Sequence, residues 1–528
     1  MFKTLSLTAM LMLGVSTATF AQEPRSGGVL NFVAPYGASF ATLDIHATPQ
    51  TQDEFYGMAI HRSLYSWDSL KNEPALELAT SVSVSDDGKV YTYKLRDNAF
   101  FHNGRKLSAD DIIWSYKRLA TPSNAFPGAR YIADIAGADA FASGKATEIS
   151  GLKKIDDLTL EITFTAPINP GFNLMRTNAA IYPADIGDKA ATNPIGLGPF
   201  KFVEHVPGSR IVVEKFDKFY EQGKPYLDKV NIVIMEDSAA RDVAFRNQEI
   251  DVTVLGPTQY VAYQGDAALS KNILEVAEGY TRNVGFNPNF APFADKRVRQ
   301  AINYAIDTKL IVERLAKNKA YRAVSWLPLS SPAYDTTAQP YAYDPEKAKA
   351  LLAEAGFDKG FEFELTATQN ESWGIPIVEA IIPMLAKVGV TVKAKPVEAS
   401  VLSEVVPAGD FQAYMWSNNS GPDALAALQC FYSKTAQSAC NYANYKNPEF
   451  DKLFEAAQVE RDEAAKTELL KKANNFLQEE APVWFFNYNK AVMAYQPWLH
   501  GLKPNATELA LQDYEDIWID ETAPASRK

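Results

Sequence analysis

Strand-like and helix-like segments alternate along almost the whole chain, and this alternation limits the folds that the chain can adopt. From Val90 to Arg96 apolar and polar residues alternate with the period of two that indicates a half-buried strand. Ser108, followed by Asp110 and Asp111, is typical of a helix N-cap with acidic residues in the first turn. The sequence contains no repeat of fixed period. The pattern therefore predicts α/β or α+β lobes and excludes a solenoid, a propeller or a β-sandwich.

Further elements can be placed from their caps and periodicity. A second strand is expected at Leu160 to Phe164. Asp295 can cap a helix whose apolar positions keep a helical period as far as Leu315. Asp344 precedes a proline at the first turn of another helix, and Gly356 follows its last turn. Long helices should therefore dominate the second half of the chain.

Size and charge exclude several classes of protein. The chain has 528 residues, of which 47% are hydrophobic, so two to four packed domains are expected. Its 52 basic and 64 acidic residues give a net charge of −12, which provides no positive field for a phosphate backbone. We therefore expect no nucleic-acid partner.

The first residues resemble a cleavable export signal. Lys3 precedes an apolar run from Leu5 to Val15, and small residues end at Ala21. The apolar run is shorter than the roughly 20 residues that span a bilayer. No cysteine follows Ala21, so a lipid anchor would lack its attachment atom. Residues 1–21 are therefore predicted to be a signal peptide, and the mature chain is predicted to be free in a bacterial periplasm.

The two cysteines, Cys430 and Cys440, are too few for a disulfide scaffold or a structural metal site built from several cysteines. In an oxidising periplasm they can form one disulfide, and two free thiols are the alternative.

A search for catalytic motifs gives no positive result. The sequence has no G-x-S-x-G, H-E-x-x-H or P-loop motif. Gly196-Leu197-Gly198 is followed by Pro199 and is interpreted as a turn. The five histidines lack metal-ligand spacing. We therefore predict no enzymatic activity, no metal and no cofactor.

Two polar segments, each with one tryptophan, are the candidate ligand-binding residues. The first lies between the strand-like Phe361 to Thr366 and a helical segment from Ile377. The second lies between Met415 and Asp423. The candidates in these segments are Thr368, Gln369, Trp373, Trp416, Asn418, Asn419 and Asp423. One large aromatic side chain with amide and hydroxyl groups suits a pocket that stacks on a ligand and hydrogen-bonds its polar atoms. The alternative is a pair of surface loops, each with a core tryptophan.

Several stretches, in order along nearly the whole mature chain, carry a resemblance to a known family. They are Leu78 to Ala79, Ser85 to Arg96, Phe101 to Gly104, Leu107 to Asp111, Asn193 to Phe200, Gly223 to Asp228, Asn287, Pro292 to Ala301 and Tyr343 to Ala348. With them the chain resembles the dipeptide- and oligopeptide-type (family 5, cluster C) periplasmic solute-binding proteins of ABC transporters. Val82 departs from the family, which usually has Trp there.

The resemblance implies an α/β, periplasmic-binding-protein-like fold with two lobes, a hinge and a cleft, plus an inserted third domain. By analogy, lobe I comprises residues 22–60, 183–276 and 488–528, the inserted domain II residues 61–182, and lobe II (domain III) residues 277–487. It also implies the capture of a small solute, a peptide or peptide-like molecule, and its delivery to the permease subunits of an ABC importer in the inner membrane. A monomer is expected.

The same resemblance raises a question of specificity. Dipeptide binders of the family hold the ligand's amino group with an Asp after the Trp of the second segment, and its carboxylate with an Arg in the first. Here Asn418 or Asn419 takes the Asp position and Thr368 the Arg position, with Asp423 as the nearest carboxylate. Because a buried ammonium without a counter-ion is costly, a zwitterionic dipeptide held in the usual way is disfavoured unless Asp423 supplies the charge.

Other functions remain open at this point. On the same fold, the solute can be an opine-like conjugate or an oligosaccharide instead of a peptide. From other classes, the alternatives are a secreted peptide hydrolase, which the missing motifs disfavour, and an interaction protein such as a sensor-coupled receptor or a chaperone-like binder.

Overall fold

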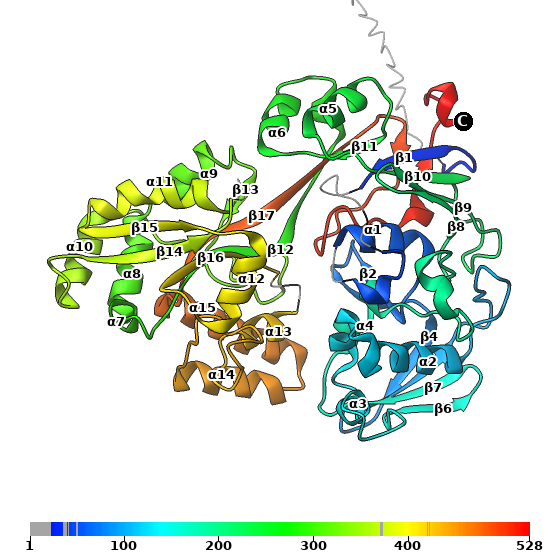
Figure 1. Cartoon of the computed structure of the whole chain (residues 1–528), viewed down its shortest axis with the longest axis horizontal. Helices are drawn as coiled ribbons and strands as arrows, with labels where there is room; N and C mark the ends of the chain where they lie inside the picture. Colours follow the sequence, from blue (N-terminus) through cyan, green and yellow to red (C-terminus); the bar gives the residue numbers. More distant parts are fainter. Residues whose placement is uncertain are drawn as a thin grey trace, which may run out of the picture.

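One mixed β-sheet runs through both lobes of the molecule (Figure 1). The structure is a computed structural model that describes residues 23–34, 40, 42–48, 51–369, 373–419, 421 and 423–528. The expected signal peptide lies outside these described residues. Among them, the sheet has 11 strands, and β13 (Ala320–Arg322) pairs with β17. The order of the others is β15 (Val390–Pro396), β14 (Phe361–Ala367), β16 (Ala413–Asn419), β12 (Ile273–Phe286), β17 (Val483–Tyr495), β11 (Val252–Val254), β1 (Val29–Val33), β10 (Lys229–Val233), β9 (Arg210–Lys215) and β8 (Phe200–Val206). The expected α/β fold with two lobes is confirmed.

Lobe I contains both ends of the described chain. Its strands are β1 (Val29–Val33), β8 (Phe200–Val206), β9 (Arg210–Lys215), β10 (Lys229–Val233), β11 (Val252–Val254), β18 (Leu499–His500) and β19 (Trp518–Ile519). Its helices are α1 (Thr51–Ile60), α5 (Ser238–Arg246) and α6 (Pro257–Gln264). The rings of Phe32, Phe55 and Tyr514 meet edge to face in its core. Burial of these aromatic residues joins the first and last segments of the chain into one body.

A third unit packs beside lobe I and has its own sheet and core (Figure 1). Its four-stranded sheet has the order β4 (Ala79–Val84), β5 (Val90–Leu95), β7 (Thr159–Thr163) and β6 (Leu152–Asp156). The remaining elements are the hairpin β2 (Tyr65–Asp68) and β3 (Glu73–Leu76) and the helices α2 (Ala109–Ala120), α3 (Ala138–Ala142) and α4 (Gly171–Leu174). The separate core fits the expected insertion of residues 61–182, although the exact domain boundaries stay a prediction.

Lobe II is one stretch of chain rich in helices. Its strands, apart from the two that enter and leave it, are β13 (Ala320–Arg322), β14 (Phe361–Ala367), β15 (Val390–Pro396) and β16 (Ala413–Asn419). Its helices are α7 (Ala291–Ala294), α8 (Lys296–Ala305), α9 (Thr308–Arg314), α10 (Pro345–Glu354), α11 (Ile375–Ala386), α12 (Ala399–Ala408), α13 (Ala424–Gln429), α14 (Pro448–Val459) and α15 (Glu463–Glu480).

Two long strands, β12 (Ile273–Phe286) and β17 (Val483–Tyr495), connect the lobes (Figure 1). They pair antiparallel in lobe I and again in lobe II, but residues 278–280 of β12 have no partner on β17. There the Glu278 carboxylate accepts a hydrogen bond from the backbone N–H of Leu509 at 2.7 Å and another from the side chain of Asn489. This interruption of the ladder is the place where the two lobes can bend relative to each other.

The local predictions of helix starts are largely confirmed. Asp111 accepts from the backbone N–H of Ser108 at 2.9 Å at the start of α2, and Asp344 caps α10 through Lys347 N. The single helix expected from Asp295 to Leu315 is wrong, because it is two helices, α8 and α9. Asp307 accepts from Leu310 N at 2.9 Å and so starts a second helix within the continuous apolar pattern.

Candidate functional site

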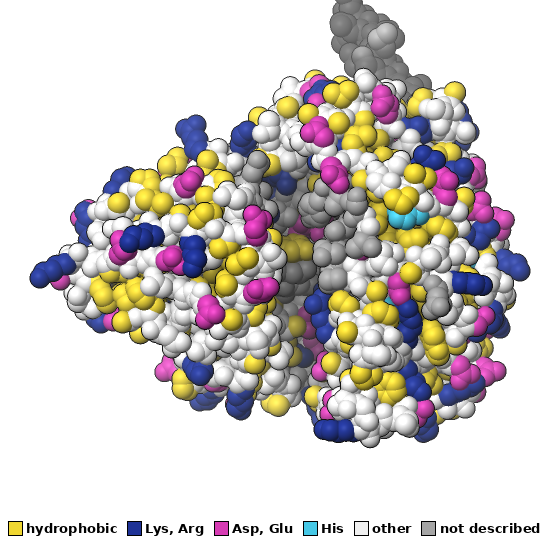
Figure 2. All heavy atoms as spheres, viewed as in Figure 1, with side chains coloured by type: hydrophobic (Ala, Val, Ile, Leu, Met, Phe, Trp, Pro, Cys, Tyr) yellow, Lys and Arg dark blue, Asp and Glu magenta, His cyan; other side chains and the backbone are white. Residues whose placement is uncertain are grey.

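A groove separates lobe II from lobe I and the third unit (Figure 2). Hydrogen bonds cross it at two places. The side chain of Asn72 donates to the carbonyl of Ser330 at 2.7 Å, and Arg461 donates to the carbonyl of Asp86 at 3.0 Å. The groove is therefore bounded on one side by the third unit and on the other by lobe II.

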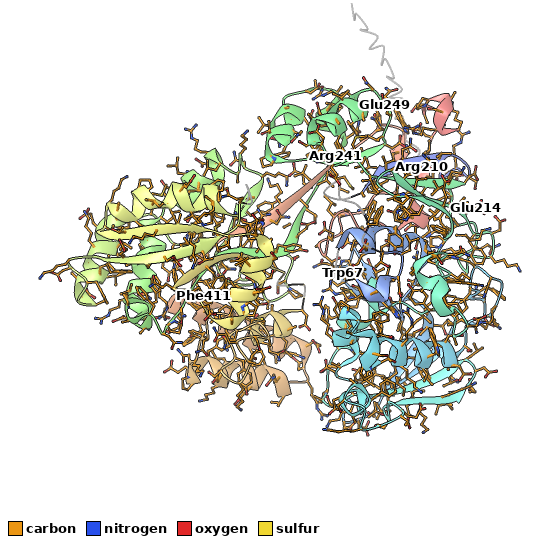
Figure 3. All side chains as sticks on the ribbon, viewed as in Figure 1. Trp67, Arg210, Glu214, Arg241, Glu249 and Phe411 are labelled. Carbon is orange, nitrogen blue, oxygen red and sulfur yellow. A yellow bond between two sulfur atoms is a disulfide. The ribbon has the colours of Figure 1, made fainter. Side chains whose placement is uncertain are left out.

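The two tryptophans of the candidate segments come together on the lobe II wall. Trp373, Trp416 and Tyr442 pack around one small apolar cluster, whose buried members are Leu402, Val406, Phe411 and Tyr414. Phe411 marks this cluster in Figure 3. The rings of Trp416 and Tyr442 lie 5.9 Å apart, and both Trp side chains are half-buried. Half-burial leaves part of each indole surface for a ligand to contact.

Thr368 and Gln369 follow β14 directly. Thr368 is buried, and its carbonyl accepts from the backbone N–H of Ile375 at 2.7 Å, which closes the segment onto the start of α11. Gln369 is exposed. The threonine is therefore part of the wall, and the glutamine extends from it.

Asn418 and Asn419 lie on β16, where the sequence suggested a loop. The strand pairs with β12, with Asn418 opposite Thr281 and Asn419 opposite Tyr280. The side-chain oxygen of Asn418 accepts from Nδ2 of Asn283 at 2.8 Å. Asn283 is fully buried, and its own Oδ1 has no hydrogen-bond partner among the described residues. A buried acceptor of this kind is suited to a donor from a ligand or a water molecule.

Asp423 is the N-cap of α13. One oxygen of its carboxylate accepts from the backbone N–H groups of Leu425 and Ala426 at 2.9 and 3.2 Å. Burial raises the pKa of this carboxyl, while the two backbone hydrogen bonds lower it. Its main contacts are thus those of a helix cap, and the second oxygen is the part left for a ligand.

The sulfur atoms of Cys430 and Cys440 are bonded, with their Cα atoms 4.9 Å apart. The bridge closes the segment after α13, and Tyr442 follows it by two residues. The disulfide therefore holds the backbone that carries one of the aromatic side chains of the wall.

The opposite wall carries charged side chains that sequence reasoning missed. Arg176 and Glu54 line a cavity of about 350 Å³, together with Met58, Trp67 and Met175. Trp67 is labelled in Figure 3 at the edge of β2 that faces lobe II. A cavity of this size suits a small molecule.

Glu54 is a titratable group of this wall whose pKa is shifted toward neutrality. Burial raises its pKa from 4.5 to about 7, although Arg176 and Arg130 act in the opposite direction. Arg176 and Glu54 also influence the pKa of Tyr280 on lobe II, and Arg130 that of Tyr442. These charges are therefore close to the lobe II wall, across the groove.

Two general searches give negative results for the part of the chain that the structure describes. No group of three or more His, Cys, Asp or Glu side chains there could hold a metal ion. None of the helices described is both long and apolar enough to cross a membrane.

Known proteins resemble this chain in sequence and in fold. Residues 73–439 match the family model described as bacterial extracellular solute-binding proteins, family 5 Middle. The chain is 30% identical to the dipeptide-binding protein of Escherichia coli strain K12, over 77% of this chain and 79% of that protein. It is 27% identical to the glutathione-binding protein GsiB of Escherichia coli strain 536, over 94% and 95% of the two chains. The solved structure of AgaA from A. tumefacien R10 in complex with agropinic acid superposes with a TM-score of 0.75 at 25% identity, over 94% and 99% of the two chains.

Proposed function

Because the chain belongs to the bacterial extracellular solute-binding proteins of family 5 and serves as the substrate-binding component of an ABC importer, we propose that its ligand is a peptide or a peptide-like solute bound in the groove between the lobes. The ligand would contact the candidate residues of lobe II and the charged wall opposite. Such a ligand favours the closed form by its contacts with both lobes, and the closed form is what the transporter engages.

The observation that carries this proposal is the packing of Trp373, Trp416 and Tyr442 against one small apolar cluster of lobe II. The two tryptophans come from segments more than 40 positions apart in the sequence, and Asn283 and Asn418 add amide groups nearby. Aromatic faces beside uncommitted amide atoms supply the stacking and hydrogen bonds that peptide bonds require.

The relatives suggest two chemical classes for the solute. The dipeptide-binding and glutathione-binding relatives favour a peptide, and the agropinic acid complex of AgaA favours an opine-like conjugate. Neither the two relatives nor the AgaA complex points to an oligosaccharide. We expect no catalysis, because the relatives are named as binding proteins and no catalytic motif is present.

Several further properties belong to the same proposal. We expect a mature monomer in the periplasm after removal of residues 1–21, working with permease subunits of the inner membrane. The three-domain division into residues 22–60, 183–276 and 488–528, residues 61–182, and residues 277–487 is proposed on the same basis.

The test is to identify and then perturb the bound solute. Mass spectrometry of small molecules released on denaturing the purified protein should reveal a peptide or a conjugate. Trp416→Ala should weaken the binding of this solute by roughly 0.5 to 1.5 kcal/mol from lost aromatic stacking, in addition to the effect of the buried apolar area that is lost. Tyr343→Ala is a matched control, because Tyr343 is an exposed aromatic residue of lobe II away from the wall. Equal affinities of the parent and Trp416→Ala would refute the site.

A further inference from the structure

Arg176 is half-buried, and its guanidinium forms no ion pair within the part of the chain that the structure describes, although the Glu54 carboxyl is near enough to interact with it. Its Nε atom is buried without a hydrogen-bond partner, and no carboxylate of the described residues forms an ion pair with it. Arg62, by contrast, pairs with Glu77 at 3.2 Å and with Glu515 at 2.6 Å. A buried N–H without a partner costs free energy. The Nε–H of Arg176 can therefore still donate to an acceptor on a ligand.

A second cation lies beside the first. The guanidinium carbon of Arg130 is 4.7 Å from the centre of the Tyr131 ring, and that of Arg176 is 5.9 Å from the same centre. Arg130 also donates to the Tyr131 hydroxyl at 2.6 Å and has no ion pair with any described carboxylate. The face of one aromatic ring offsets little of the repulsion between two guanidinium groups. A carboxylate placed between them would be attracted by both guanidinium groups and would reduce their mutual repulsion.

Two tyrosines of lobe II lie near these arginines. Arg176 lies close enough to Tyr280, and Arg130 close enough to Tyr442, to influence the pKa values of these phenols. Tyr442 in turn packs near Trp416. The positive charges are thus on the wall of the third unit, and the aromatic and amide groups are on lobe II.

We propose that Arg176 and Arg130 form an anion-binding subsite that holds a carboxylate of the ligand against the wall of the third unit. This proposal rests on the proposed function, namely that a solute occupies the groove. The carboxylate accepts from Nε and an Nη atom of Arg176 in the bidentate manner that guanidinium favours, with Arg130 as the second cation. The solute is therefore an acid, such as an acidic peptide or an opine, whose apolar or amide part lies on Trp416.

The assignment also accounts for the neutral position at Thr368. A ligand carboxylate held by Arg176 needs no arginine on lobe II, and its charge then contributes to bridging the two lobes. The Glu54 carboxyl interacts with both arginines, and it competes with the ligand when ionised. Its raised pKa keeps this competition weaker than an ordinary glutamate would exert.

The binding test uses matched pairs of compounds on the full mature chain. A panel of dipeptides, reduced glutathione and opine acids, each beside its carboxamide, is screened for the rise in melting temperature, with neutral disaccharides included. Calorimetry on the best pair should show the acid bound at least about tenfold more tightly than the amide. Arg176→Gln should remove that ratio. Three outcomes would overturn the proposal. The tightest ligand could be neutral, the acid and its amide could bind equally, or no acid in the panel could stabilise the protein.

A second measurement needs no ligand. Arg176→Gln should leave the melting temperature of the ligand-free protein unchanged or raise it, since it removes an unpaired charge. Arg62→Gln is the control and should lower it, because Glu77 and Glu515 lose their partner. A fall in Arg176→Gln equal to that of Arg62→Gln would show that Arg176 is structural and would end the proposal.

Different results would contradict the binding of a solute in the groove and the presence of the anion-binding subsite. If Trp416→Ala weakens the ligand while Arg176→Gln leaves its affinity and the acid-to-amide ratio unchanged, the groove binds the solute and the anion subsite is wrong. If neither change affects binding, the proposed function itself is wrong.

Discussion

The side-chain amide of Asn283 on β12 donates a 2.8 Å hydrogen bond to the side-chain oxygen of Asn418 on β16, across the middle of lobe II. This contact fixes the orientation of both amides. It leaves Oδ1 of Asn283 buried and without a partner among the described residues. The pair therefore keeps one amide oxygen available as a hydrogen-bond acceptor.

Removing this acceptor tests its role. Asn283→Ala should weaken the binding of the ligand, because the free amide oxygen is lost. It should also lower the free energy of unfolding by about 1 to 2 kcal/mol, because Asn418 loses its donor. Asn418→Ala and the double variant complete a cycle, measured by urea denaturation, that isolates the coupling between the two amides. Unchanged ligand affinity in Asn283→Ala would show that the free oxygen is not used.

Plain dipeptides should bind poorly, because Thr368 and Asn418 or Asn419 provide no charges for the two peptide termini. Calorimetry with alanyl dipeptides is expected to give weak or no binding. Asn418→Asp or Asn419→Asp should improve it by supplying a counter-ion for the amino group. Submicromolar binding to the parent protein, abolished by Asp423→Asn, would instead assign the amino-group contact to Asp423.

The bond between Cys430 and Cys440 should stabilise the protein modestly. The two cysteines are ten positions apart, and such a short loop contributes about 3 kcal/mol or less. Thiol labelling of the unfolded, unreduced protein should detect no free thiol, and two thiols per chain would contradict the bridge. Reduction of the disulfide should also weaken the binding of the ligand, because the bridge holds the backbone before Tyr442, and Tyr442 packs beside Trp416.

Glu54 should make stability depend on pH near neutrality. Burial raises its pKa from 4.5 to about 7, Asp53 adds to the rise, and Arg176 and Arg130 oppose it. The folded protein thus holds this proton more tightly than the unfolded chain. The resulting stabilisation is complete below about pH 4.5 and is lost as the pH rises through about 7.

Glu54→Gln isolates this effect. The variant should gain stability relative to the parent as the pH increases from 5 to 8, measured by urea denaturation at each pH. Acidic ligands should bind the parent more tightly at pH 6 than at pH 8, and the variant should lose that difference. Parallel pH profiles of the two proteins would contradict the assignment.

Ligand binding should close the groove. A solute that contacts both lobes favours the closed state, so the melting temperature should rise and small-angle scattering should give a smaller radius of gyration. A tightly bound ligand that produces no compaction would contradict hinge closure.

Local chemistry made much of the fold predictable from the sequence. The caps at Ser108, Asp295 and Asp344 were placed correctly because each depends on residues within one helical turn. The break between α8 and α9 was missed because Asp307 interrupts an apolar pattern that continues through it. A capping side chain therefore outweighed periodicity at that point.

The site was predictable only in part, for a physical reason. Trp373 and Trp416 carried a visible signal, because each stands beside polar residues in the sequence. Arg176, Arg130 and Glu54 carried none, since an arginine without a partner looks the same in sequence as one with a partner. Only packing between distant segments shows that Arg62 is neutralised and Arg176 is not.

The paired strands β12 and β17 have a mechanical consequence. Their hydrogen bonds on both sides of residues 278–280 resist sliding of one lobe past the other, whereas the gap in the β12–β17 ladder between them allows rotation. The two strands therefore restrict the motion of the lobes to rotation about one axis. Solutes of different shape would then close the lobes along the same path and produce the same closed conformation. A permease that recognises only this conformation needs no contact with the bound solute.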